Sequence, residues 1–364
     1  MASAQGGAGT GGLAGFFSAL FSSGGSYVGL NIGASHVKVV QLKKRGKGWE
    51  FVSFGSSPIE GAISEQREIL SPQTVTAAIK DACAKARVSS REVCAAVGGA
   101  GVIIKTITVT VTDIKELNDQ VLWEAEQYIP FDMNDVAIDF EVIRKITAEQ
   151  FDVLVVAVKK DLLDQICSAV ESAKMKLNVV DVESFALQNC FEANYDMPTD
   201  HAVMIADIGA LGMKTVICSS NTPLFTKDSP YGGMMVSQEI QRELKLPSLM
   251  DAEALKTSGN LPQEVSEIIA RTSHMLGSEL KKSIDFYSAS SVGPPVTVVY
   301  LSGGTARSPD IQETIREYVG VPVEFLNPFE RIQGGSRASP DFLETIAREA
   351  AVPVGLAMRA RDRR

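Results

Sequence analysis

Two short segments of the sequence carry a glycine turn and a lysine at the same spacing. Residues 31–40 read NIGASHVKVV, and residues 207–216 read DIGALGMKTV. In each segment an apolar run ends, a glycine permits a tight turn, and a second apolar run begins. Such a strand–turn–strand points several backbone N–H groups outward, where they can hold the oxygens of a phosphate. The chemistry that this spacing predicts is the binding of an anionic group.

The residue before each turn adds a second chemical function. Asp207 in the later segment can orient water on a magnesium ion, which prefers oxygen ligands. Asn31 in the earlier segment keeps an acceptor oxygen but removes one negative charge from such a site. Either segment alone is equally typical of an ordinary hairpin. Because the two segments repeat each other, they favour a duplicated domain pair that grips a triphosphate from both sides.

A third glycine element, LSGGTAR, occupies residues 301–307. It follows the apolar strand VTVVYL and precedes a helix that Ser308 and Pro309 would open. Ligands of open α/β sheets bind at the carboxyl ends of strands, so this loop is a candidate ligand contact, with a plain βα loop as the alternative. The chain has no G-x-x-x-x-G-K-[ST] motif, which excludes the P-loop class, and GGAG at 98–101 matches a dinucleotide fingerprint only weakly.

Apolar periodicity predicts the elements that must position these loops. In the first half we expect strands at 27–32, 37–42, 50–54, 93–97 and 177–182 and helices at 72–86 and 184–194. In the second half we expect strands at 202–207, 214–219, 223–227, 296–301 and 321–326, helices at 234–245, 251–257, 263–289, 309–319 and 341–349, and then a short apolar VPVGLAM segment. Between 103 and 175 we expect strands at 103–111, 136–142 and 151–158 and helices at 113–129 and 161–175. On helix 113–129 the apolar face would consist of Leu117, Val121, Ala125 and Tyr128.

Composition limits the class of protein. The 364 residues are 45% hydrophobic and 22% charged, which is typical of a globular chain of two or three folded units. A net charge of −9 argues against nucleic acid as the main partner. Five cysteines without a C-x-x-C pair indicate reduced thiols, and three dispersed histidines are too few for a zinc cluster. These numbers exclude a collagen-like fibre and a disulfide scaffold, and no apolar run is long enough to predict a membrane span.

The hairpins, the GG loop and the duplicated βββαβα layout together resemble the actin/sugar-kinase/heat-shock-70 ATPase superfamily. Within it, the chain resembles the PilM family of actin-like type IV pilus assembly proteins from about Tyr27 to Arg359. The segments that carry this resemblance are GLNIGASHVKVVQL (29–42), EAEQYIPFDMNDV (124–136), VDVESFAL (180–187), ADIGALGMKTV (206–216), LSGGTARSPDI (301–311) and VEFLNPFE (323–330).

The resemblance implies an α/β, actin-like fold: two RNase H-like βββαβα halves around a nucleotide cleft, with an inserted small subdomain of the FtsA type. The implied divisions are a Gly/Ala/Ser-rich leader (1–26), half I (27–198) with the insert at about 105–160, half II (199–359) with a nucleotide-binding subdomain at about 234–300, and a basic tail (360–364). The leader contains an apolar patch, Leu13–Phe21, which is either a flexible segment or a weak interfacial helix.

The resemblance also implies the residues of an ATP and magnesium site. The implied nucleotide contacts are Gly33, Ala34, Ser35 and Lys38 on the first loop, Asp207, Gly209, Gly212 and Lys214 on the second, and Gly232, Gly233, Glu253, Lys256, Gly303, Gly304 and Thr305 beyond them. Magnesium would be held, through water, by Asp207 and Asn31. Glu183 falls where chaperone relatives keep an acid beside the attacking water, although it is equally suited to be a helix-capping carboxylate.

The implied function is an ATP-binding scaffold at the cytoplasmic face of the inner membrane, with at most slow ATP turnover because of Asn31. Its implied partners are the cytoplasmic N-terminal peptide of the membrane protein PilN and other inner-membrane and motor components, with self-association into a homo-oligomer left open. Trp123, Tyr128 and Phe131 would anchor the peptide, unless these aromatics form the core of the inserted subdomain.

Two alternatives belong to other functional classes. A small-molecule kinase of the same superfamily would need an acid–base constellation at a substrate pocket, and none is evident beyond the nucleotide loops. A membrane-bound filament former like FtsA would end in an amphipathic apolar helix, whereas this sequence ends in RARDRR.

Overall fold

The computed structural model describes residues 27–59, 61–258, 261–290, 293–308, 311–335 and 338–359. The expected leader, its Leu13–Phe21 patch and the basic tail lie outside the described residues. These residues divide into an insert unit, Val102–Asp161, and a main unit made of 27–101 and Leu162–Arg359. Among them, no helix combines the length and the apolarity that crossing a membrane requires.

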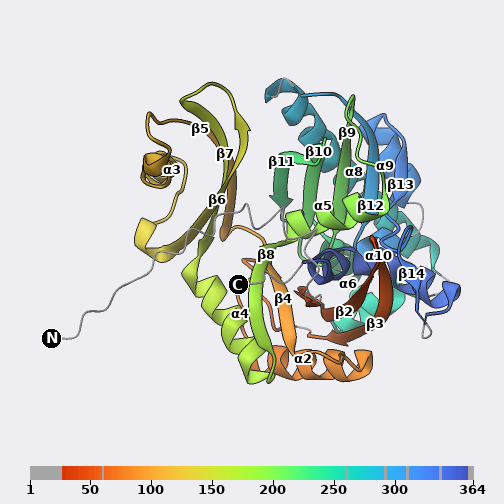
Figure 1. The fold of residues 1–364 in the computed structure, drawn as a ribbon. Helices are drawn as coiled ribbons and strands as arrows, with labels where there is room; N and C mark the ends of the chain where they lie inside the picture. The colour runs from red at the N-terminus through yellow and green to blue at the C-terminus, as the bar shows by residue number, and fades with distance from the viewer. Residues whose placement is uncertain are drawn as a thin grey trace. The chain divides into compact units, whose positions relative to one another are not determined.

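The first sheet of the main unit has six strands in the order β14-β3-β2-β1-β4-β8 (Figure 1). Their bounds are β1 Val28–Ile32, β2 His36–Arg45, β3 Gly48–Pro58, β4 Glu92–Val97, β8 Lys176–Val182 and β14 Gln333–Gly334. β1 pairs antiparallel with β2 and parallel with β4. β3 extends beyond the predicted 50–54 because its backbone pairs with β2 over the whole length of β2, from His36 with Pro58 to Arg45 with Gly48.

The second sheet repeats this arrangement with five strands in the order β11-β10-β9-β12-β13. The strands are β9 Ala202–Ile208, β10 Met213–Ser219, β11 Thr222–Ser229, β12 Val296–Ser302 and β13 Val323–Phe325. Asn31 pairs with Lys38 across the first hairpin, and Asp207 pairs with Lys214 across the second. The duplicated α/β halves predicted from the repeat are therefore confirmed.

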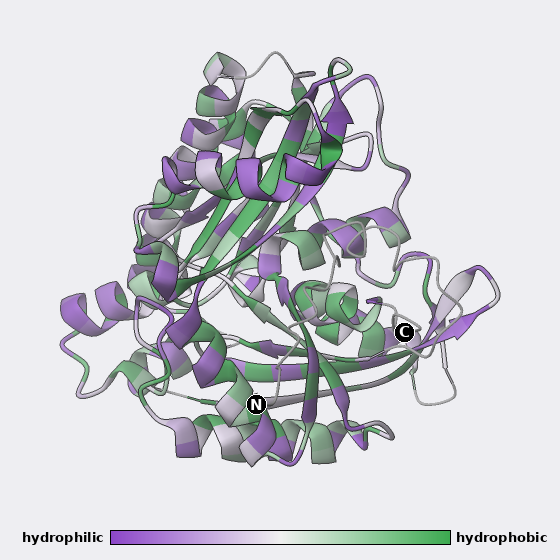
Figure 2. Cartoon of the chain, turned by 60° about the vertical axis from the view of Figure 1, so that its left-hand side comes forward, coloured by the Kyte–Doolittle hydropathy of each residue, from purple (hydrophilic) through white to green (hydrophobic). Residues whose placement is uncertain are grey.

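Helices cover the sheets and fill the space between them. The helices of the main unit are α2 Pro72–Ala86, α4 Lys160–Ser172 (which begins in the insert unit), α5 Glu183–Asn194, α6 Gly233–Glu243, α7 Leu249–Lys256, α8 Gln263–Ser290, α9 Ile311–Val319, α10 Pro340–Ala357 and the 3-10 turn η4 Gly304–Arg307. One core cluster joins α5 and α10 to apolar side chains of both sheets, among them Val40, Phe51 and Ile205. Strands of these sheets are largely green in Figure 2, while the outer faces of several helices are purple, as burial of one helix face predicts.

α10 corrects one prediction. The sequence predicts a helix at 341–349 followed by a separate VPVGLAM segment, but the helix continues through Pro353 to Ala357. Pro353 removes a backbone donor, yet this end of the helix is deeply buried. A Cβ on Gly29 would lie 2.0 Å from the Pro353 carbonyl oxygen, and one on Gly355 would lie 1.8 Å from that of Ala186. Glycines therefore let α10 pack directly on β1 and α5, and this packing stabilises a helix that proline alone would end.

The insert unit is a three-stranded antiparallel sheet with one helix. β5 (Val102–Thr110), β7 (Gln150–Lys159) and β6 (Val136–Lys145) lie in that order, and two 3-10 turns, η2 (Ile114–Glu116) and η3 (Met133–Asp135), flank α3 (Leu117–Glu126). The predicted helix 113–129 is thus too long, because Asp113 caps η2 and α3 ends before Tyr128. As a result Leu117, Val121 and Ala125 are buried as predicted, whereas Tyr128 is exposed.

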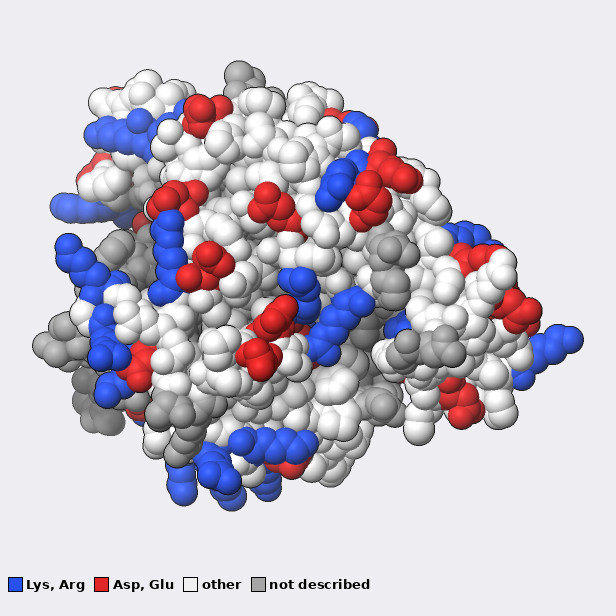
Figure 3. Space-filling model, turned by 90° about the vertical axis from the view of Figure 1, so that its right-hand side faces the viewer, with Lys and Arg blue, Asp and Glu red and all other residues white. Residues whose placement is uncertain are grey.

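Charge is mixed on the face drawn in Figure 3, where basic and acidic side chains lie close to one another instead of forming a broad field of one sign. This face therefore differs from the extended basic fields that attract polyanions.

Candidate functional site

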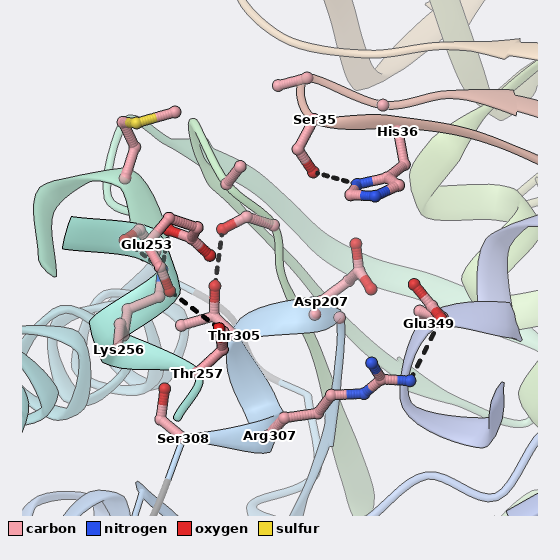
Figure 4. A pocket seen from close by; sticks show the side chains of 18 of the residues that line it. Ser35, His36, Asp207, Glu253, Lys256, Thr257, Thr305, Arg307, Ser308 and Glu349 are labelled. Atoms are coloured by element: carbon pink, nitrogen blue, oxygen red, sulfur yellow. Dashed lines mark hydrogen bonds and ion pairs between the residues drawn. The ribbon is translucent and has the colours of Figure 1, made fainter. Parts of the chain in front are cut away.

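A cavity of about 610 Å³ lies within the main unit. It is lined by both glycine hairpins, by α7 and the start of α6, by the loop after β12, and by α10 (Figure 4). Of the predicted nucleotide contacts, thirteen line it: Gly33, Ala34, Ser35, Lys38, Asp207, Gly209, Lys214, Gly233, Glu253, Lys256, Gly303, Gly304 and Thr305. Asn31 and Glu183 line it as well. Segments far apart in the sequence thus meet at one site.

The first hairpin presents a tight turn to the cavity. The N–H of Gly33 donates to the carbonyl oxygen of His36 at 3.0 Å, and a Cβ on Gly33 would lie 2.9 Å from that oxygen. The Ser35 hydroxyl and His36 Nδ1 lie 3.1 Å apart and face the cavity. The glycine is needed to close this turn, and the turn carries the hydroxyl and the imidazole to the cavity wall.

The second hairpin is fixed from two sides. The N–H of Gly209 donates to the carbonyl oxygen of Gly212 at 2.9 Å, and the Gly209 carbonyl accepts from the N–H of Gly233 and from the Thr305 hydroxyl. Gly212 and Gly232 are not brought to the cavity wall. A Cβ on Gly232 would lie 2.4 Å from the Ala210 carbonyl oxygen, so Gly232 allows the start of α6 to approach the hairpin backbone.

The loop after β12 contains two glycines with different roles. Gly303 has φ +95°, and its Cβ would lie 2.3 Å from the carbonyl oxygen of Ile208, so only glycine fits. Nothing lies within 4 Å of the position that a Cβ on Gly304 would take. Gly303 therefore secures the loop against the second hairpin, and Gly304 leaves a backbone surface open toward the cavity.

Glu253 and Lys256 form an ion pair at 2.6 Å on α7. The ammonium of Lys256 also donates to the Ser237 hydroxyl at 2.8 Å and to the Gly233 carbonyl at 3.2 Å. α7 begins with a capping box between Ser248 and Asp251, which fixes its first turn. The two predicted residues are therefore tied to α6, at the cavity wall.

Glu183 is buried between two cations. Arg67 Nη2 lies 2.7 Å from its Oε1, and Lys214 Nζ lies 3.0 Å from its Oε2 as an ion pair. Burial alone would raise the pKa of Glu183, but the two adjacent cations outweigh it and hold the pKa below its usual range. A Cβ on Gly98 would lie 2.2 Å from Oε2, so a glycine makes room for the carboxylate. A carboxylate held in this way is a weak proton acceptor, which argues against a general-base role.

Three residues of the cavity wall that carry an ionic side chain were not among the predicted contacts: Arg67, Arg307 and Glu349. Glu349 Oε2 lies 3.3 Å from Lys38 Nζ, and its Oε1 lies 3.1 Å from Arg307 Nη2. Figure 4 shows the Arg307–Glu349 pair directed across the cavity. Arg307 stands in the LSGGTAR motif and could have been found there, but no local pattern identifies Arg67 or Glu349.

The donors available to a magnesium ion are few. Among the described residues, no group of three or more His, Cys, Asp or Glu side chains is placed to hold a metal, and Asp207 takes part in no ion pair. Asp207 and the amide of Asn31 both line the cavity. Magnesium commonly keeps several waters and binds proteins through one or two carboxylates plus substrate phosphates. The residues present fit that mode and do not fit a cage made of protein ligands alone.

The aromatic residues of the insert unit differ in exposure. Trp123 and Tyr128 are 60% and 48% exposed, whereas Phe131 is half-buried against the core of the insert unit. The Lys159 ammonium lies 4.6 Å from the Phe131 ring centroid, and that of Lys105 lies 5.4 Å from that of Tyr128. Two of the three predicted anchors are thus at the surface, and the third belongs largely to the core.

Two repeated sheets, each with three antiparallel strands followed by two parallel ones, and a cavity walled by the glycine hairpin of each sheet define an actin-like fold. The insert unit interrupts the first repeat between β4 and β8.

Comparison with known proteins gives the family. The model of the family described as type IV pilus assembly protein PilM matches residues 29–361. A solved structure described as "PilM-PilN type IV pilus biogenesis complex" is similar with a TM-score of 0.82 and 29% identity, over 92% of this chain and 98% of that one. The ethanolamine utilization protein EutJ from Carboxydothermus hydrogenoformans shares the fold at a TM-score of 0.57 and 13% identity, over 92% and 89% of the two chains. The chain belongs to the PilM family of type IV pilus assembly proteins.

Proposed function

We propose that the chain is an ATP-binding scaffold of the pilus assembly machinery. In this proposal, the cavity of the main unit binds ATP with magnesium, and the insert unit binds a cytoplasmic N-terminal peptide of PilN. The observation that carries the proposal is the convergence of two equivalent hairpins and the LSGGTAR loop on one cavity. The peptide partner is supported by the similar structure, which is described as a PilM–PilN complex.

The cavity residues divide the binding work among themselves. The N–H groups of Gly33 and Gly209 already close their own turns. The turn residues that follow these glycines would offer backbone N–H groups to phosphate oxygens, and the lysines of the hairpins would add positive charge. The open backbone at Gly304 would leave room for the nucleoside part of the ligand, next to Glu253 and Lys256. Asp207 and Asn31 would hold magnesium through water, and the metal would neutralise phosphate charge.

Turnover of ATP is slow or absent in this proposal. Asn31 leaves the metal side with one carboxylate, so less charge holds the metal and its water in place. Glu183 is neutralised by Arg67 and Lys214 and cannot readily accept a proton. Bound nucleotide would therefore act without being hydrolysed. Its binding would favour the closed form of the cleft, and the insert unit would respond to that form.

The proposed place of this scaffold is the cytoplasmic face of the inner membrane, where it is held by its partners. Other inner-membrane and motor components would assemble around it, and self-association into a homo-oligomer would extend the platform. This part of the proposal rests on family membership.

Peptide titration of the full chain, with and without ATP and magnesium, tests the proposal. We expect Trp123→Ala to weaken the peptide affinity by roughly 10-fold, because exposed aromatic anchors dominate peptide interfaces. Phe286→Ala is the matched control, since Phe286 is 62% exposed in the main unit. A peptide that binds Trp123→Ala as well as the unchanged protein would contradict the proposed surface. A peptide affinity that is the same with and without ATP would contradict the coupling while leaving the scaffold role.

A further inference from the structure

The two hairpin lysines occupy equivalent positions in the repeat. Lys38 is the cross-strand partner of Asn31, and Lys214 is the cross-strand partner of Asp207. Both line the cavity, where the charge of a polyphosphate would be bound. Each is already paired with a glutamate, so neither ammonium is simply available to a ligand.

Each of these ion pairs joins residues from different halves of the sequence. Lys38, on β2 of the first half, pairs with Glu349 on α10, which ends the second half in the sequence but packs on β1 of the first sheet. Lys214, on β10 of the second half, pairs with Glu183 on α5, the helix that follows β8 of the first half. Each glutamate also holds an arginine from the half opposite to that of its lysine: Arg307 for Glu349 and Arg67 for Glu183.

The two ion pairs differ in how easily the lysine can leave its glutamate for another anion. The side chains of Lys214 and Glu183 are 11% and 3% exposed, and Glu183 keeps Arg67 as a second close partner at 2.7 Å. The side chains of Lys38 and Glu349 are each 17% exposed, and they lie 3.3 Å apart. An ion pair that water and a ligand can reach is exchanged at lower cost than a buried one, whose separated charges would be left unsolvated. Lys38 is therefore the ammonium that can change partners.

We propose that Glu349 sets the affinity of the cavity for polyphosphates by competing with the ligand for Lys38, and that Glu349, placed between Lys38 and Arg307, ties β2 of the first half to the η4 turn of the second half in the absence of ligand. The first part rests on the proposed nucleotide-binding function; the second does not. When a triphosphate binds, Lys38 exchanges Glu349 for a phosphate oxygen, and Glu349 keeps Arg307 as its partner. The Lys214–Glu183 pair stays in place.

Binding of ATP and of inorganic tripolyphosphate to Glu349→Gln tests the first part. We expect both ligands to bind roughly 10-fold tighter than to the unchanged protein, because Lys38 is no longer held by an internal carboxylate. Glu344→Gln, on the exposed side of the same helix, should leave both affinities unchanged. An affinity of Glu349→Gln that is unchanged or weaker would overturn the competition, because a merely structural role of Glu349 cannot tighten binding.

Thermal unfolding without any ligand tests the second part and separates its failure from that of the proposed function. We expect Lys38→Met and Glu349→Gln each to lower the melting temperature, and the double variant to lose several degrees less than the sum of the two losses. If the unchanged protein bound neither ATP nor tripolyphosphate, the proposed nucleotide function would fail. The comparison of the single and double variants would still show whether Glu349 links the two halves. Fully additive losses would overturn the tie.

Discussion

The two hairpins have equivalent strand pairing and turn hydrogen bonds but differ in charge. Asn31 and Asp207 occupy the same position in the register, one neutral and one acidic. The ion pair of the first hairpin lysine is partly exposed, with both side chains at 17%, whereas that of the second is more deeply buried, at 11% and 3%. In the proposed function the two hairpins therefore have different roles: Asp207 of the second would supply fixed charge for a metal, and Lys38 of the first would supply an exchangeable cation.

The glycine pairs at the ends of β4 and β12 make a second comparison between the halves. Gly98 makes room for the Glu183 carboxylate, and Gly303 makes room for the backbone at Ile208. Only the later pair lines the described cavity. Equivalent glycines therefore make room for the Glu183 ion cluster after β4 and line the cavity after β12, which agrees with the weak match of GGAG at 98–101 to a dinucleotide fingerprint.

Removal of the Glu183 carboxylate should have the largest effect on stability. Glu183→Gln leaves Arg67 and Lys214 close together without a counter-charge, and we expect a loss of about 3 kcal/mol in the free energy of unfolding at pH 7. Because the folded pKa of Glu183 lies below its unfolded value of about 4.3, its contribution is present above that pH and is lost as the pH falls through the folded pKa. Denaturant unfolding at several pH values should show the two proteins converging as the pH falls below about 4.3 and through the folded pKa of Glu183.

The matched control is Glu313→Gln, which removes an exposed ion pair with Arg316. We expect it to change stability by less than about 0.5 kcal/mol at every pH. Parallel pH profiles for the unchanged protein and Glu183→Gln would show that the buried triad does not stabilise the fold through charge.

Gly303→Ala should destabilise the second half by about 2 to 3 kcal/mol. The methyl group would overlap the Ile208 backbone, and alanine disfavours φ +95°. Gly304→Ala, at the next position and in open space, should change the free energy of unfolding by less than about 1 kcal/mol. Chemical denaturation of both variants makes the measurement, and equal losses would mean that the loop shifts freely and is not held by the hairpin.

Asp207→Asn makes the second hairpin resemble the first. We expect ATP affinity in the presence of magnesium to fall by roughly 30-fold, or about 2 kcal/mol, because the metal side loses its unpaired carboxylate. Calorimetric titration gives the affinity, and Asp200→Asn, at an exposed position before β9, controls for the change of side-chain type. If Asp207→Asn bound as tightly as the unchanged protein, the two halves would not differ in the way we describe.

Asn31→Asp makes the first hairpin resemble the second and should have the smallest effect. We expect a gain of about 3-fold in affinity for ATP with magnesium, with little gain in the presence of a chelator, because the added charge acts on the metal. The same titration with and without magnesium measures both values. An equal change in both conditions would point to an effect on the hairpin backbone instead.

Much of the fold follows from local patterns. The hairpin registers are predictable because glycine fixes the turn and apolar residues bracket it, as at Gly33 and Gly209. The end of α10 was predicted wrongly because Pro353 is a helix breaker locally, and its tolerance comes from the packing around Gly29 and Gly355. The length of α3 was also predicted wrongly, since Tyr128 continues the helical spacing beyond the point where the helix ends.

The candidate site, like the fold, contains residues that the sequence predicts and residues that it does not. The repeat aligns Lys38 with Lys214, and the family resemblance then implied both as nucleotide contacts. Glu349 was not predicted, because its role depends on how α10 lies against β2 and the η4 turn, and no local pattern encodes that contact. Gly212 and Gly232 were assigned to the ligand but line no described part of the cavity, because close backbone packing also requires glycine.

The most direct test of the central claim is calorimetric titration of the full chain with ATP and magnesium, followed by measurement of phosphate release on the same samples. If the two hairpins bind phosphate as proposed, ATP binds saturably at one site. Because Asn31 is neutral and Glu183 is held in ion pairs, we expect little phosphate release over the time of the experiment. Fast release would contradict the assignment of an occupancy-driven scaffold. No binding at all would contradict the central claim and would mean that both hairpins are structural features of the fold without a ligand.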